Sequence, residues 1–496
     1  MTPNRMTGKR LIIVSNRLPI TLTRKEGDEW QIKPGSGGLV TAMAPVLRDR
    51  GGLWIGWPGT MEEISSGIYE KVSKENEKFG YDLKPVSLTR ADVEAYYKGF
   101  ANEIIWPLFH DLIDHSNFDP EYWDAYEAVN GKFADVIIHN LSGDDFIWVH
   151  DYHLMNVAAH LRDKNLQGQI AFFLHIPFPP PDIFVRLPWR FEILNALLQY
   201  DLIGFQTMRD RRNFLQCIRT FLHPVRAQGK GQVVRIDFED REVRIGAFPI
   251  SIDYHEFRNL AETKDVGEKA WLIHEKFPER QIILGIDRLD YTKGILERLS
   301  AFRQALRLYP EIRGKASLVQ VVVPSRRDIP EYANLKEEIE RLVGEINGEF
   351  TQSHWVPIYY MFRSLPRPEL LAYYRTAEIA LLTPLKDGMN LVAKEYCACQ
   401  LERTGVLILS EFAGSAAQFQ QGALLINPHD INGTAAAIRE ALNMPKDERR
   451  RRMEKLRRNV RRYDIFWWVD SFLEAAIARH LDSFPRMEDY IPRENP

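Results

Sequence analysis

The second half of the chain alternates short aliphatic runs with longer helical segments, and this alternation constrains the fold more than any other feature. Residues 282–286 form one such run, and the segment after it places Ile295, Leu299, Phe302 and Leu306 at helical spacing. Further aliphatic runs follow at 318–323, 358–360, 379–382, 406–409 and 424–426. Pro357 cannot donate a ladder hydrogen bond, which weakens the strand assignment at 358–360. Six strands with intervening helices predict a complete Rossmann-like unit.

The first half predicts a second unit of the same class. Aliphatic and aromatic runs at 11–14, 146–149 and 170–174 read as strands. A chain of 496 residues also exceeds what one hydrophobic core usually serves. Pro249 and the polar stretch 259–267 indicate a boundary between the two halves. The predicted division is a first Rossmann-like domain at 1–255, a second at 256–463 and a C-terminal helix at 464–485.

The end of the chain combines a basic run with an apolar one. Arginines are frequent from Arg449 to Arg462, where Met453, Leu456 and Val460 recur at helical spacing. This pattern favours an amphipathic helix with a solvated basic face over a nucleic-acid-binding segment. The following residues, 465–473, are too apolar for a free tail, so we expect them to cross back and pack on the first domain.

Composition excludes several classes of protein. The 65 Lys and Arg residues nearly balance the 68 Asp and Glu residues, which gives no reason to expect nucleic acid or an acidic membrane as a partner. The apolar run 11–14 is too short for a signal sequence, and no stretch approaches the length of a membrane span. The three cysteines lack zinc-site spacing, so we interpret them as reduced packing residues of a cytoplasmic protein.

The segment 384–395 predicts a ligand site after the strand 379–382. Asp387 and Gly388 form a turn, and a helix begins at Leu391 with its free N–H groups and positive dipole end toward a ligand. Asp387 would reach sugar hydroxyls, and Glu395 would accept a hydrogen bond from a ribose. The alternative is an ordinary loop with a solvated Lys394–Glu395 pair.

A second cluster predicts an anion site in the same domain. Arg288 and Lys293 lie across a strand-to-helix turn, so both cations can converge on a diphosphate, and Gly294 lets the helix approach it. The alternative is a surface network of these cations with Asp287 and Asp290. No Asp-X-Asp triplet suited to a metal-bound diphosphate is apparent, so metal independence is predicted.

Two further polar residues follow predicted strands of the first domain. Asp151 and His175 stand at carboxyl ends of strands, where open α/β sheets bind ligands, although a histidine in such a place is more often structural. Gly35, Gly37 and Gly38 form a glycine-rich turn without the spacing of a dinucleotide fingerprint.

These motifs together resemble the trehalose-6-phosphate synthases of glycosyltransferase family 20, from about Arg10 to Leu473. The segments that carry the resemblance, besides 384–395, are residues 14–19, 35–39, 54–59, 148–154, 175–179, 204–207 and 287–294. The resemblance implies a GT-B fold, with two Rossmann-like domains facing across a cleft. It implies transfer of glucose from UDP-glucose to glucose 6-phosphate with retention, giving α,α-trehalose 6-phosphate and UDP.

The resemblance also implies roles for individual residues. The catalytic set is Asp151, His175, Arg288, Lys293 and Asp387. The donor set is Gly37, Gly38, His175, Arg288, Lys293, Asp387, Gly388, Met389, Asn390, Leu391 and Glu395. The acceptor set is Arg17, Tyr97, Trp106, Asp151 and Arg326, although Arg327 could exchange roles with its neighbour. Residues 18–38 are a candidate mobile lid.

The family is thought to lack a carboxylate nucleophile, so a same-face mechanism is expected, in which a donor phosphate oxygen takes the acceptor proton. No metal or other cofactor is expected, and the only partners expected are the two small-molecule substrates, with a homo-oligomer left open. Another protein is expected to dephosphorylate the product. The alternatives are a synthase that uses glycerol 3-phosphate, GDP-glucose or ADP-glucose, and an inactive homologue that binds sugar phosphates.

Overall fold

A computed structural model describes residues 9–24, 30–35, 38–62, 72, 79–222, 227–229, 231–325, 330–478, 481, 484 and 489–490. The chain divides into two compact units. Unit 1 comprises Met1–Ile250 and Ile465–Met487, and unit 2 comprises Ser251–Asp464 and Glu488–Pro496. The chain therefore passes from unit 1 to unit 2 after Ile250 and returns after Asp464.

Unit 1 contains a mainly parallel sheet. The three strands that the sequence predicted in this unit are β1, β6 and β7 of that sheet. In sheet order, the strands among the described residues are β5 (Asp82–Pro85), β4 (Leu53–Trp57), β1 (Arg10–Arg17), β6 (Asp145–His150), β7 (Gln169–Phe173), β8 (Leu202–Phe205), β11 (Arg241–Ala247), β10 (Val233–Phe238) and β9 (Ala227–Gln228). Only the β9–β10 and β10–β11 pairs are antiparallel. The strand order reverses at β1, because β4 and β5 extend the sheet on one side and β6 on the other. Ligands of open α/β sheets bind at such a reversal.

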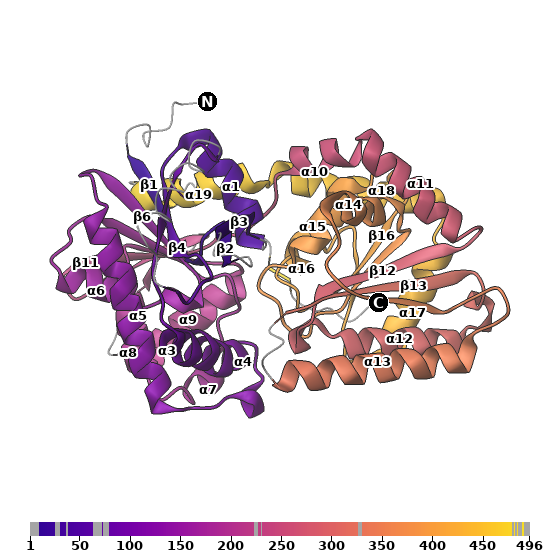
Figure 1. Ribbon diagram of the computed structural model, residues 1–496, viewed down its shortest axis with the longest axis horizontal. Helices are drawn as coiled ribbons and strands as arrows, with labels where there is room; N and C mark the ends of the chain where they lie inside the picture. Colours follow the sequence, from indigo (N-terminus) through magenta and orange to yellow (C-terminus); the bar gives the residue numbers. More distant parts are fainter. Residues whose placement is uncertain are drawn as a thin grey trace. The chain divides into compact units, whose positions relative to one another are not determined.

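The helices of unit 1 are shown in Figure 1. Among the described residues they are α1 (Gly38–Arg50), α3 (Arg90–Asp92), the π-helix η1 (Val93–Ile105), α4 (Trp106–Phe109), the 3-10 helix η2 (Ile113–His115), α5 (Pro120–His139), the 3-10 helix η3 (Tyr152–Leu154), α6 (Val157–Asp163), α7 (Pro181–Phe184), α8 (Arg190–Leu197), α9 (Met208–Phe221) and α19 (Ile465–Ile477). β2 (Ile20–Arg24) and β3 (Trp30–Pro34) form a separate antiparallel hairpin, within the segment predicted to be a lid.

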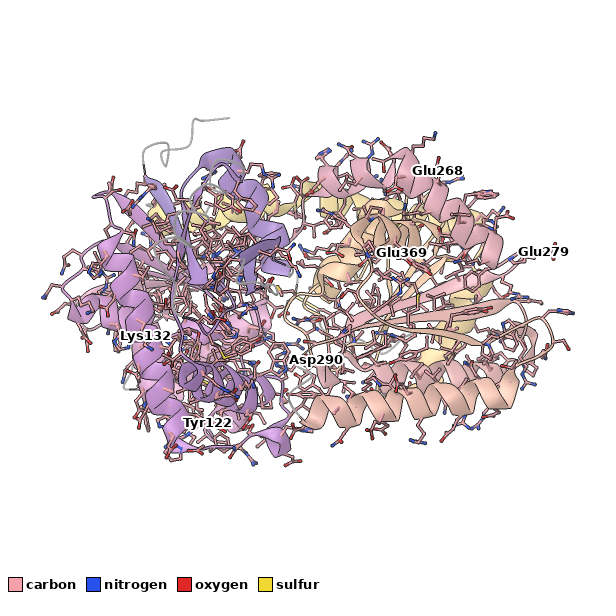
Figure 2. The ribbon with its side chains drawn as sticks, viewed as in Figure 1. Tyr122, Lys132, Glu268, Glu279, Asp290 and Glu369 are labelled. Atoms are coloured by element: carbon pink, nitrogen blue, oxygen red, sulfur yellow. The ribbon has the colours of Figure 1, made fainter. Side chains whose placement is uncertain are left out.

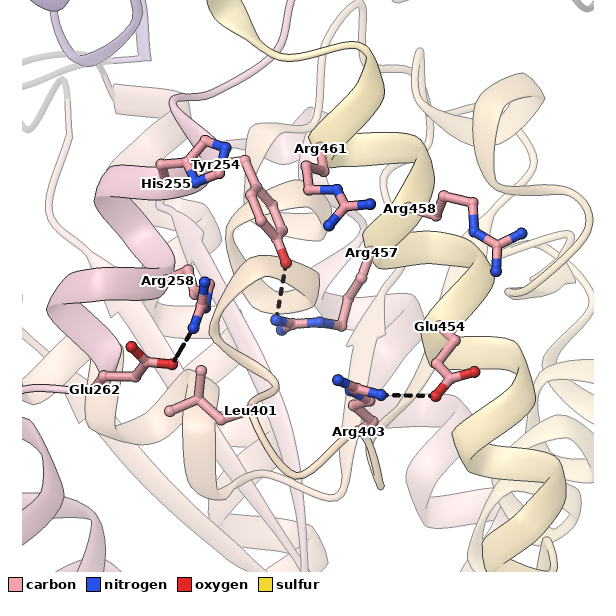
Figure 3. A pocket seen from close by; sticks show the side chains of 10 residues that line it. All are labelled: Tyr254, His255, Arg258, Glu262, Leu401, Arg403, Glu454, Arg457, Arg458 and Arg461. Carbon is pink, nitrogen blue, oxygen red and sulfur yellow. Dashed lines mark hydrogen bonds and ion pairs between the residues drawn. The ribbon is translucent and has the colours of Figure 1, made fainter.

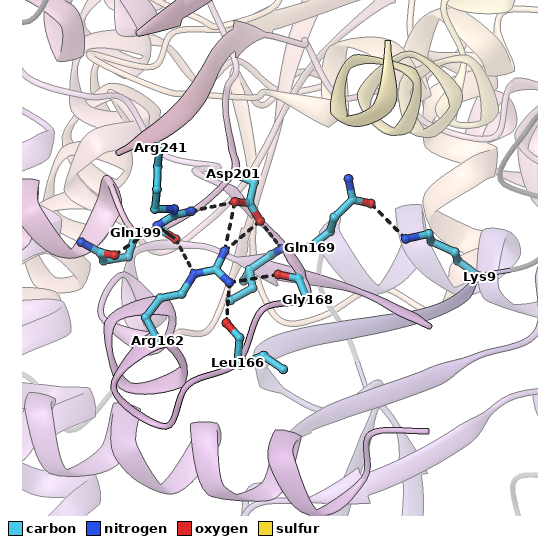
Figure 4. A network of polar contacts seen from close by, with 9 residues as sticks. Lys9, Arg162, Leu166, Gly168, Gln169, Gln199, Asp201 and Arg241 are labelled. Carbon is cyan, nitrogen blue, oxygen red and sulfur yellow. Dashed lines mark hydrogen bonds and ion pairs between the residues drawn. The ribbon is translucent and has the colours of Figure 1, made fainter. Parts of the chain in front are cut away.

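An ion-pair network fastens the amino ends of β7 and β8 to α6 (Figure 4). Asp201 accepts hydrogen bonds from Arg162 Nη2 at 2.9 Å, from Arg241 Nη2 at 2.6 Å and from the backbone N–H of Ile170 at 2.8 Å. Charge-assisted bonds of this kind are roughly twice as strong as neutral ones. The network lies at the strand ends opposite to Asp151 and His175, so it serves the scaffold.

Helix α19 belongs to unit 1, which confirms that the C-terminal helix crosses back to the first domain. The Trp468 indole N–H donates to the Phe248 carbonyl at 3.0 Å, and the Phe472 ring stacks on Trp148 at 4.3 Å. The rings of Trp148, Trp468 and Phe472 are all buried. Burial of large aromatic side chains explains why this segment does not remain a free tail.

Unit 2 is the predicted Rossmann-like unit. Its sheet has the order β14 (Ile358–Phe362), β13 (Ala316–Val323), β12 (Gln281–Arg288), β15 (Ile379–Leu382), β16 (Val406–Ser410) and β17 (Leu424–Ile426), and all of its strand pairs are parallel. This is the doubly wound order 3-2-1-4-5-6. The strand after Pro357 is an edge strand, where the missing N–H costs least.

Helices cover both faces of this sheet (Figure 1). On one face lie α12 (Ile295–Leu308), α13 (Pro330–Phe350) and α17 (Ile431–Asn443). On the other lie α10 (Tyr254–Ala261), α11 (Lys264–Lys276), α14 (Arg367–Thr376), α15 (Leu391–Cys399) and α18 (Lys446–Arg462), and α16 (Ala416–Phe419) is a short turn of helix.

Helix α18 confirms the predicted amphipathic helix, but the prediction that its arginines form a solvated face is partly wrong. Met453, Leu456 and Val460 are buried, as the helical spacing predicted. Arg449 and Arg457 are also buried, at 7% and 9% exposure. Their guanidinium groups donate to backbone carbonyls, among them those of Ala441 and Ala398, so part of the basic run is structural and not solvated.

Two further expectations concern the whole chain. The three cysteines are free and buried, which agrees with a packing role. Burial raises the pKa of the Cys217 thiol and of the Cys397 thiol to about 12, so neither is a reactive thiolate at neutral pH. None of the helices in the described part of the chain combines the length and apolar character needed to cross a membrane.

Candidate active site

The two predicted donor motifs of unit 2 lie at neighbouring strand ends. β12 pairs in parallel with β15 through Ile283–Ile379 and Leu284–Ala380, so the loops that follow both strands leave the same edge of the sheet. The strand order reverses between these two strands. Arg288 is the last residue of β12, Lys293 follows that strand, and Asp387 follows β15. The sheet therefore brings both motifs to its topological switch point, the usual ligand site of this fold.

Lys293 and Asp387 form a direct ion pair between these loops. Lys293 Nζ lies 2.7 Å from Asp387 Oδ2, and the two side chains are only 12% and 10% exposed. Asp387 also accepts hydrogen bonds from the Met389 N–H at 3.1 Å and from Asn390 Nδ2 at 3.4 Å. The carboxylate is thus oriented by donors on both loops.

Arg288 presents its guanidinium at the end of β12. Its side chain is exposed, and no carboxylate in the described part of the chain pairs with it. The predicted alternative, a network with Asp287 and Asp290, is not what the structure shows. Asp287 pairs with buried Arg298 at 2.6 Å. Asp290, which is labelled in Figure 2, accepts from the Thr292 N–H at 3.0 Å to cap the following turn. Arg288 is therefore available to an anion.

Two glycines allow these loops to pack closely. Gly294 has φ 59°, and a Cβ there would lie 2.0 Å from the Thr383 carbonyl oxygen. A Cβ at Gly414 would lie 1.7 Å from the Gly388 carbonyl oxygen. Gly414 also donates its N–H to the Asp387 carbonyl at 2.8 Å. Only glycine fits at either position, because any side chain would push the Asp387 loop away.

Helix α15 begins at Leu391, as predicted. Asn390 adopts a left-handed conformation with φ 56° and caps the helix by accepting from the Ala393 N–H at 3.2 Å. The N–H groups of the first turn face the end of the sheet at which Asp387 lies, which makes this terminus suited to an anion or a polar ligand.

The Lys394–Glu395 pair is not the solvated pair of the alternative interpretation. Lys394 is 1% exposed, donates to Gln418 Oε1 at 2.7 Å, and has its pKa lowered by burial to about 7. Glu395 accepts from the Tyr374 hydroxyl at 2.9 Å, and burial raises its pKa. One hydrogen bond from Tyr374 leaves Glu395 with further acceptor capacity.

Unit 1 brings the predicted acceptor residues Arg17 and Tyr97 together on one indole. The Arg17 guanidinium carbon lies 4.3 Å from the centre of the Trp57 ring, and the Tyr97 ring lies 5.9 Å from the same ring. Arg17 stands at the exposed end of β1 and has no carboxylate partner among the described residues. A cation held on a ring face keeps its N–H groups available to a phosphate.

Trp106 joins this group through a chain of aromatic contacts. Its ring lies 5.7 Å from Tyr152, Tyr152 lies 3.9 Å from His153, and His153 stacks on Tyr97 at 5.8 Å. Tyr97 is on η1, and Trp106 immediately follows it. Such π-helical turns are rare and often occur at functional sites.

Asp151 and His175 lie side by side at the ends of β6 and β7. Asp151 has φ 77° and accepts from the His175 backbone N–H at 3.2 Å. A left-handed aspartate of this kind is uncommon and indicates a constrained site.

Both nitrogens of the His175 ring have hydrogen-bond partners. Its Nε2 lies 3.0 Å from His150 Nδ1, and its Nδ1 lies 3.2 Å from Gln206 Nε2. Gln206 Oε1 accepts from the Ile250 N–H at 2.9 Å, which orients the amide so that Nε2 donates to His175. His175 must then carry its proton on Nε2 and donate it to His150. A direct contact of this ring with the donor glucose would require one of these bonds to open.

Some predicted residues lie outside the described part of the chain. These are Gly37, Arg326 and Arg327. Gly38 is the first residue of α1.

The structure also adds residues that sequence reasoning missed. They are Trp57, His150, His153, Gln206 and Gly414. Trp57, His150, His153 and Gln206 stood within segments that carry the family resemblance, which was the only available signal. Gly414 carried no signal, because its contacts are to residues distant in the sequence.

Comparison with known proteins bears directly on this arrangement. Residues 9–478 match glycosyltransferase family 20. The chain belongs to glycosyltransferase family 20. It is 42% identical over 469 residues to the trehalose-6-phosphate synthase of Mycobacterium avium, covering 94% of both chains. It is also 42% identical over 481 residues to a bifunctional trehalose-6-phosphate synthase/phosphatase of Thermoproteus tenax, but spans only 64% of that protein.

Solved structures of this glycosyltransferase family have the same fold. An α,α-trehalose-phosphate synthase (UDP-forming) of Burkholderia xenovorans, in complex with glucose-6-phosphate, matches with TM-score 0.84 and 35% identity, over 94% of this chain and 99% of that one. The E. coli enzyme bound with UDP-2-fluoro glucose matches with TM-score 0.84 and 34% identity over the same shares. These matches confirm the predicted fold class. They also confirm that the chain is a glycosyltransferase.

Proposed function

We propose that this chain transfers glucose from UDP-glucose to glucose 6-phosphate, with retention at the anomeric carbon, to give α,α-trehalose 6-phosphate and UDP. The observation that carries this proposal is the 42% identity to a trehalose-6-phosphate synthase over 94% of both chains. An identity of this size along the whole length includes both units, and therefore the residues proposed to bind the donor and those proposed to bind the acceptor. The proposal names the reaction of a glycosyltransferase whose family is established.

The donor is assigned to the switch point of unit 2. Arg288 and Lys293 would neutralise the diphosphate, and the first turn of α15 would face it. Glu395, held by Tyr374 at 2.9 Å, would accept from the uridine ribose. As UDP departs it gains negative charge, so fixed cations stabilise the transition state more than the ground state. Residues 388–391 would line the donor, and donor contacts of Gly37, Gly38 and His175 stay predictions.

The acceptor is assigned to unit 1. Arg17 would bind the phosphate of glucose 6-phosphate, with Tyr97 and Trp106 as hydrogen-bond donors and Asp151 on the sugar. The contact of Arg17 and Tyr97 with Trp57 supports this assignment, because one rigid ring then positions a cation and a hydroxyl together. Arg326 completes the acceptor set as a prediction.

The hydrogen bonds of Asp387 favour a positioning role over a nucleophilic one. Its oxygens already accept from Lys293, Met389 and Asn390, and such bonds stabilise the carboxylate and lower its nucleophilicity. We therefore assign Asp387 to orienting glucose hydroxyls. The acceptor proton would pass to a donor phosphate oxygen on the same face, and no metal is assigned to the step.

The reaction is proposed to take place in the cytoplasm. The buried, free state of all three cysteines suits a reducing compartment.

An assay of every donor and acceptor pair tests the proposal. UDP-, GDP- and ADP-glucose would each be combined with glucose 6-phosphate, glycerol 3-phosphate and no acceptor, and release of the nucleoside diphosphate measured. We expect the highest rate with UDP-glucose and glucose 6-phosphate, and a disaccharide phosphate in the product. A faster rate with another pair would reassign the substrates. Tight binding of glucose 6-phosphate without turnover under any donor would show an inactive homologue.

A further inference from the structure

A basic pocket of about 520 Å³ lies within unit 2 (Figure 3), lined by α10, α18 and the segment that follows α15. None of the residues assigned above to donor or acceptor lines it. Its volume is within the range of small-molecule sites, which is about 300 to 1,000 Å³. Its walls carry five arginines and one histidine against two glutamates.

The two glutamates neutralise two of the arginines. Glu262 accepts from Arg258 at 2.8 Å along α10, and Glu454 accepts from Arg403 at 2.8 Å. These pairs are drawn as dashed lines in Figure 3. Three arginines remain, all from α18: Arg457, Arg458 and Arg461.

Arg457 builds the floor of the pocket. Its Nη1 donates to the carbonyls of Cys397, Ala398 and Gln400 at the end of α15, at 2.7 to 2.9 Å. Its Nη2 donates to the Tyr254 hydroxyl at 2.9 Å. All of these partners are neutral oxygens, so the buried positive charge is offset only by the negative end of the α15 dipole. The charge of Arg457 therefore adds to the potential of the pocket.

Arg458 and Arg461 are exposed at the wall, and no carboxylate in the described part of the chain pairs with either of them. Arg457 and Arg461 reach from α18 toward Tyr254 on α10 (Figure 3). Arginine presents a planar fork of N–H donors that matches a phosphate in a bidentate manner. We propose that this pocket binds a small anion carrying two or more phosphate charges, at a site separate from the donor and acceptor sites.

Such a ligand would join the first and last helices that the structure describes in unit 2. α10 begins at Tyr254, shortly after the chain enters unit 2 at Ser251. α18 ends at Arg462, shortly before the chain leaves unit 2 after Asp464. An anion that bridges these helices would stabilise unit 2 against unfolding, because it binds only the folded arrangement.

Calorimetric titration of the full chain with inorganic pyrophosphate tests the site, and every protein in the comparison, the reference included, carries Arg17→Ala and Arg288→Ala to weaken the proposed acceptor and donor phosphate sites. We expect one equivalent to bind. The double variant Arg458→Ala/Arg461→Ala should weaken this binding about 10- to 100-fold, the loss expected for removing hydrogen bonds to a charged group. The matched control is Arg450→Ala/Arg462→Ala, which removes two exposed arginines from the same helix outside the pocket. Its affinity should stay within about twofold of the reference protein.

A variant that is expected to strengthen pyrophosphate binding provides a second test. Glu454→Gln releases Arg403 from its partner, so pyrophosphate should bind about threefold more tightly. Equal weakening in both double variants, or binding of RNA or heparin but not of pyrophosphate, would overturn the proposal, because either shows a general basic surface. Absence of any pyrophosphate binding would overturn it as well. The donor and acceptor assay is unaffected by these outcomes, so the two proposals fail independently.

Discussion

His150 Nδ1 lies 3.0 Å from His175 Nε2 in the interior of unit 1, and both rings are almost fully buried. Burial lowers the pKa of His175 to about 3. Burial first, and the neighbouring His175 second, lower the pKa of His150 well below its ordinary value. Both histidines are therefore neutral in the folded protein at physiological pH.

The neutral pair predicts a loss of stability in mild acid. Below pH 6.5 the unfolded chain binds protons on these two histidines, whereas in the folded protein each ring stays neutral until the pH reaches its lowered pKa, which is about 3 for His175. Their contribution is therefore complete above pH 6.5 and is lost as the pH falls. The slope is about 1.4 kcal/mol per pH unit for each histidine. Urea unfolding between pH 7.5 and 4.5 would measure it. His150→Gln should reduce the slope, whereas exposed His139→Gln should leave it unchanged. Equal slopes in all three proteins would contradict the buried neutral pair.

Removal of the exposed cation at the end of β12 should impair catalysis. Arg288→Ala is expected to lower kcat/KM for UDP-glucose about 10²- to 10³-fold, because it removes a charge aimed at the departing diphosphate. Release of UDP gives the rate. Arg341→Ala, an exposed arginine on α13, is the matched control and should keep full activity. Unchanged turnover in Arg288→Ala would show that the diphosphate binds elsewhere.

Asp387→Asn should slow the reaction without trapping an intermediate. The amide keeps the shape of the side chain but loses the ion pair with Lys293 at 2.7 Å, so the sugar would be oriented poorly. Intact-protein mass spectrometry after mixing with UDP-glucose should show only the unmodified chain. An adduct with the mass of one hexose would mean that a covalent glycosyl-enzyme forms, and the same-face mechanism would be wrong.

The buried lysine of α15 predicts a stability change in the alkaline range. Burial lowers the Lys394 pKa to about 7, whereas the unfolded lysine titrates near its ordinary pKa of 10.5. Between these values the unfolded chain holds the extra proton, so stability should rise with pH by about 1.4 kcal/mol per unit. Lys394→Met should remove this rise, and Lys455→Met, at an exposed position of α18, should preserve it. Denaturant unfolding at pH 7 to 10 makes the comparison. Parallel curves for all three proteins would refute the lowered pKa.

Metal removal should leave the activity intact. Arg288 and Lys293 supply two positive charges at the proposed diphosphate site, which is the task that a divalent cation performs elsewhere. We expect the rate of UDP release in excess EDTA to stay within about twofold of the untreated rate. A tenfold loss that Mg²⁺ restores would show that these side chains are insufficient.

Local patterns were enough to predict the strand and the helix that frame the proposed site of unit 2. The buried strand β15, Ile379–Leu382, and the start of α15 at Leu391 both agree with the sequence prediction. An apolar run, a turn and a helix start are properties of neighbouring residues, so they can be read without knowing the fold. Unit 1 was predicted less completely, because strands such as β4 (Leu53–Trp57) and β8 (Leu202–Phe205) are short and contain a glycine.

The sequence by itself determined which residues could meet a ligand, because strand and helix periodicity depends on near neighbours. Only the tertiary structure decided what those residues contact. Lys293 meets Asp387 because β12 and β15 are adjacent, although 94 positions separate the two residues. Arg457 is buried, against the predicted solvated face, and Lys394 is buried, against the alternative interpretation of its segment, because distant groups satisfy their hydrogen bonds. A buried polar side chain is stable only where partners exist, and folding alone supplies partners from remote parts of the chain.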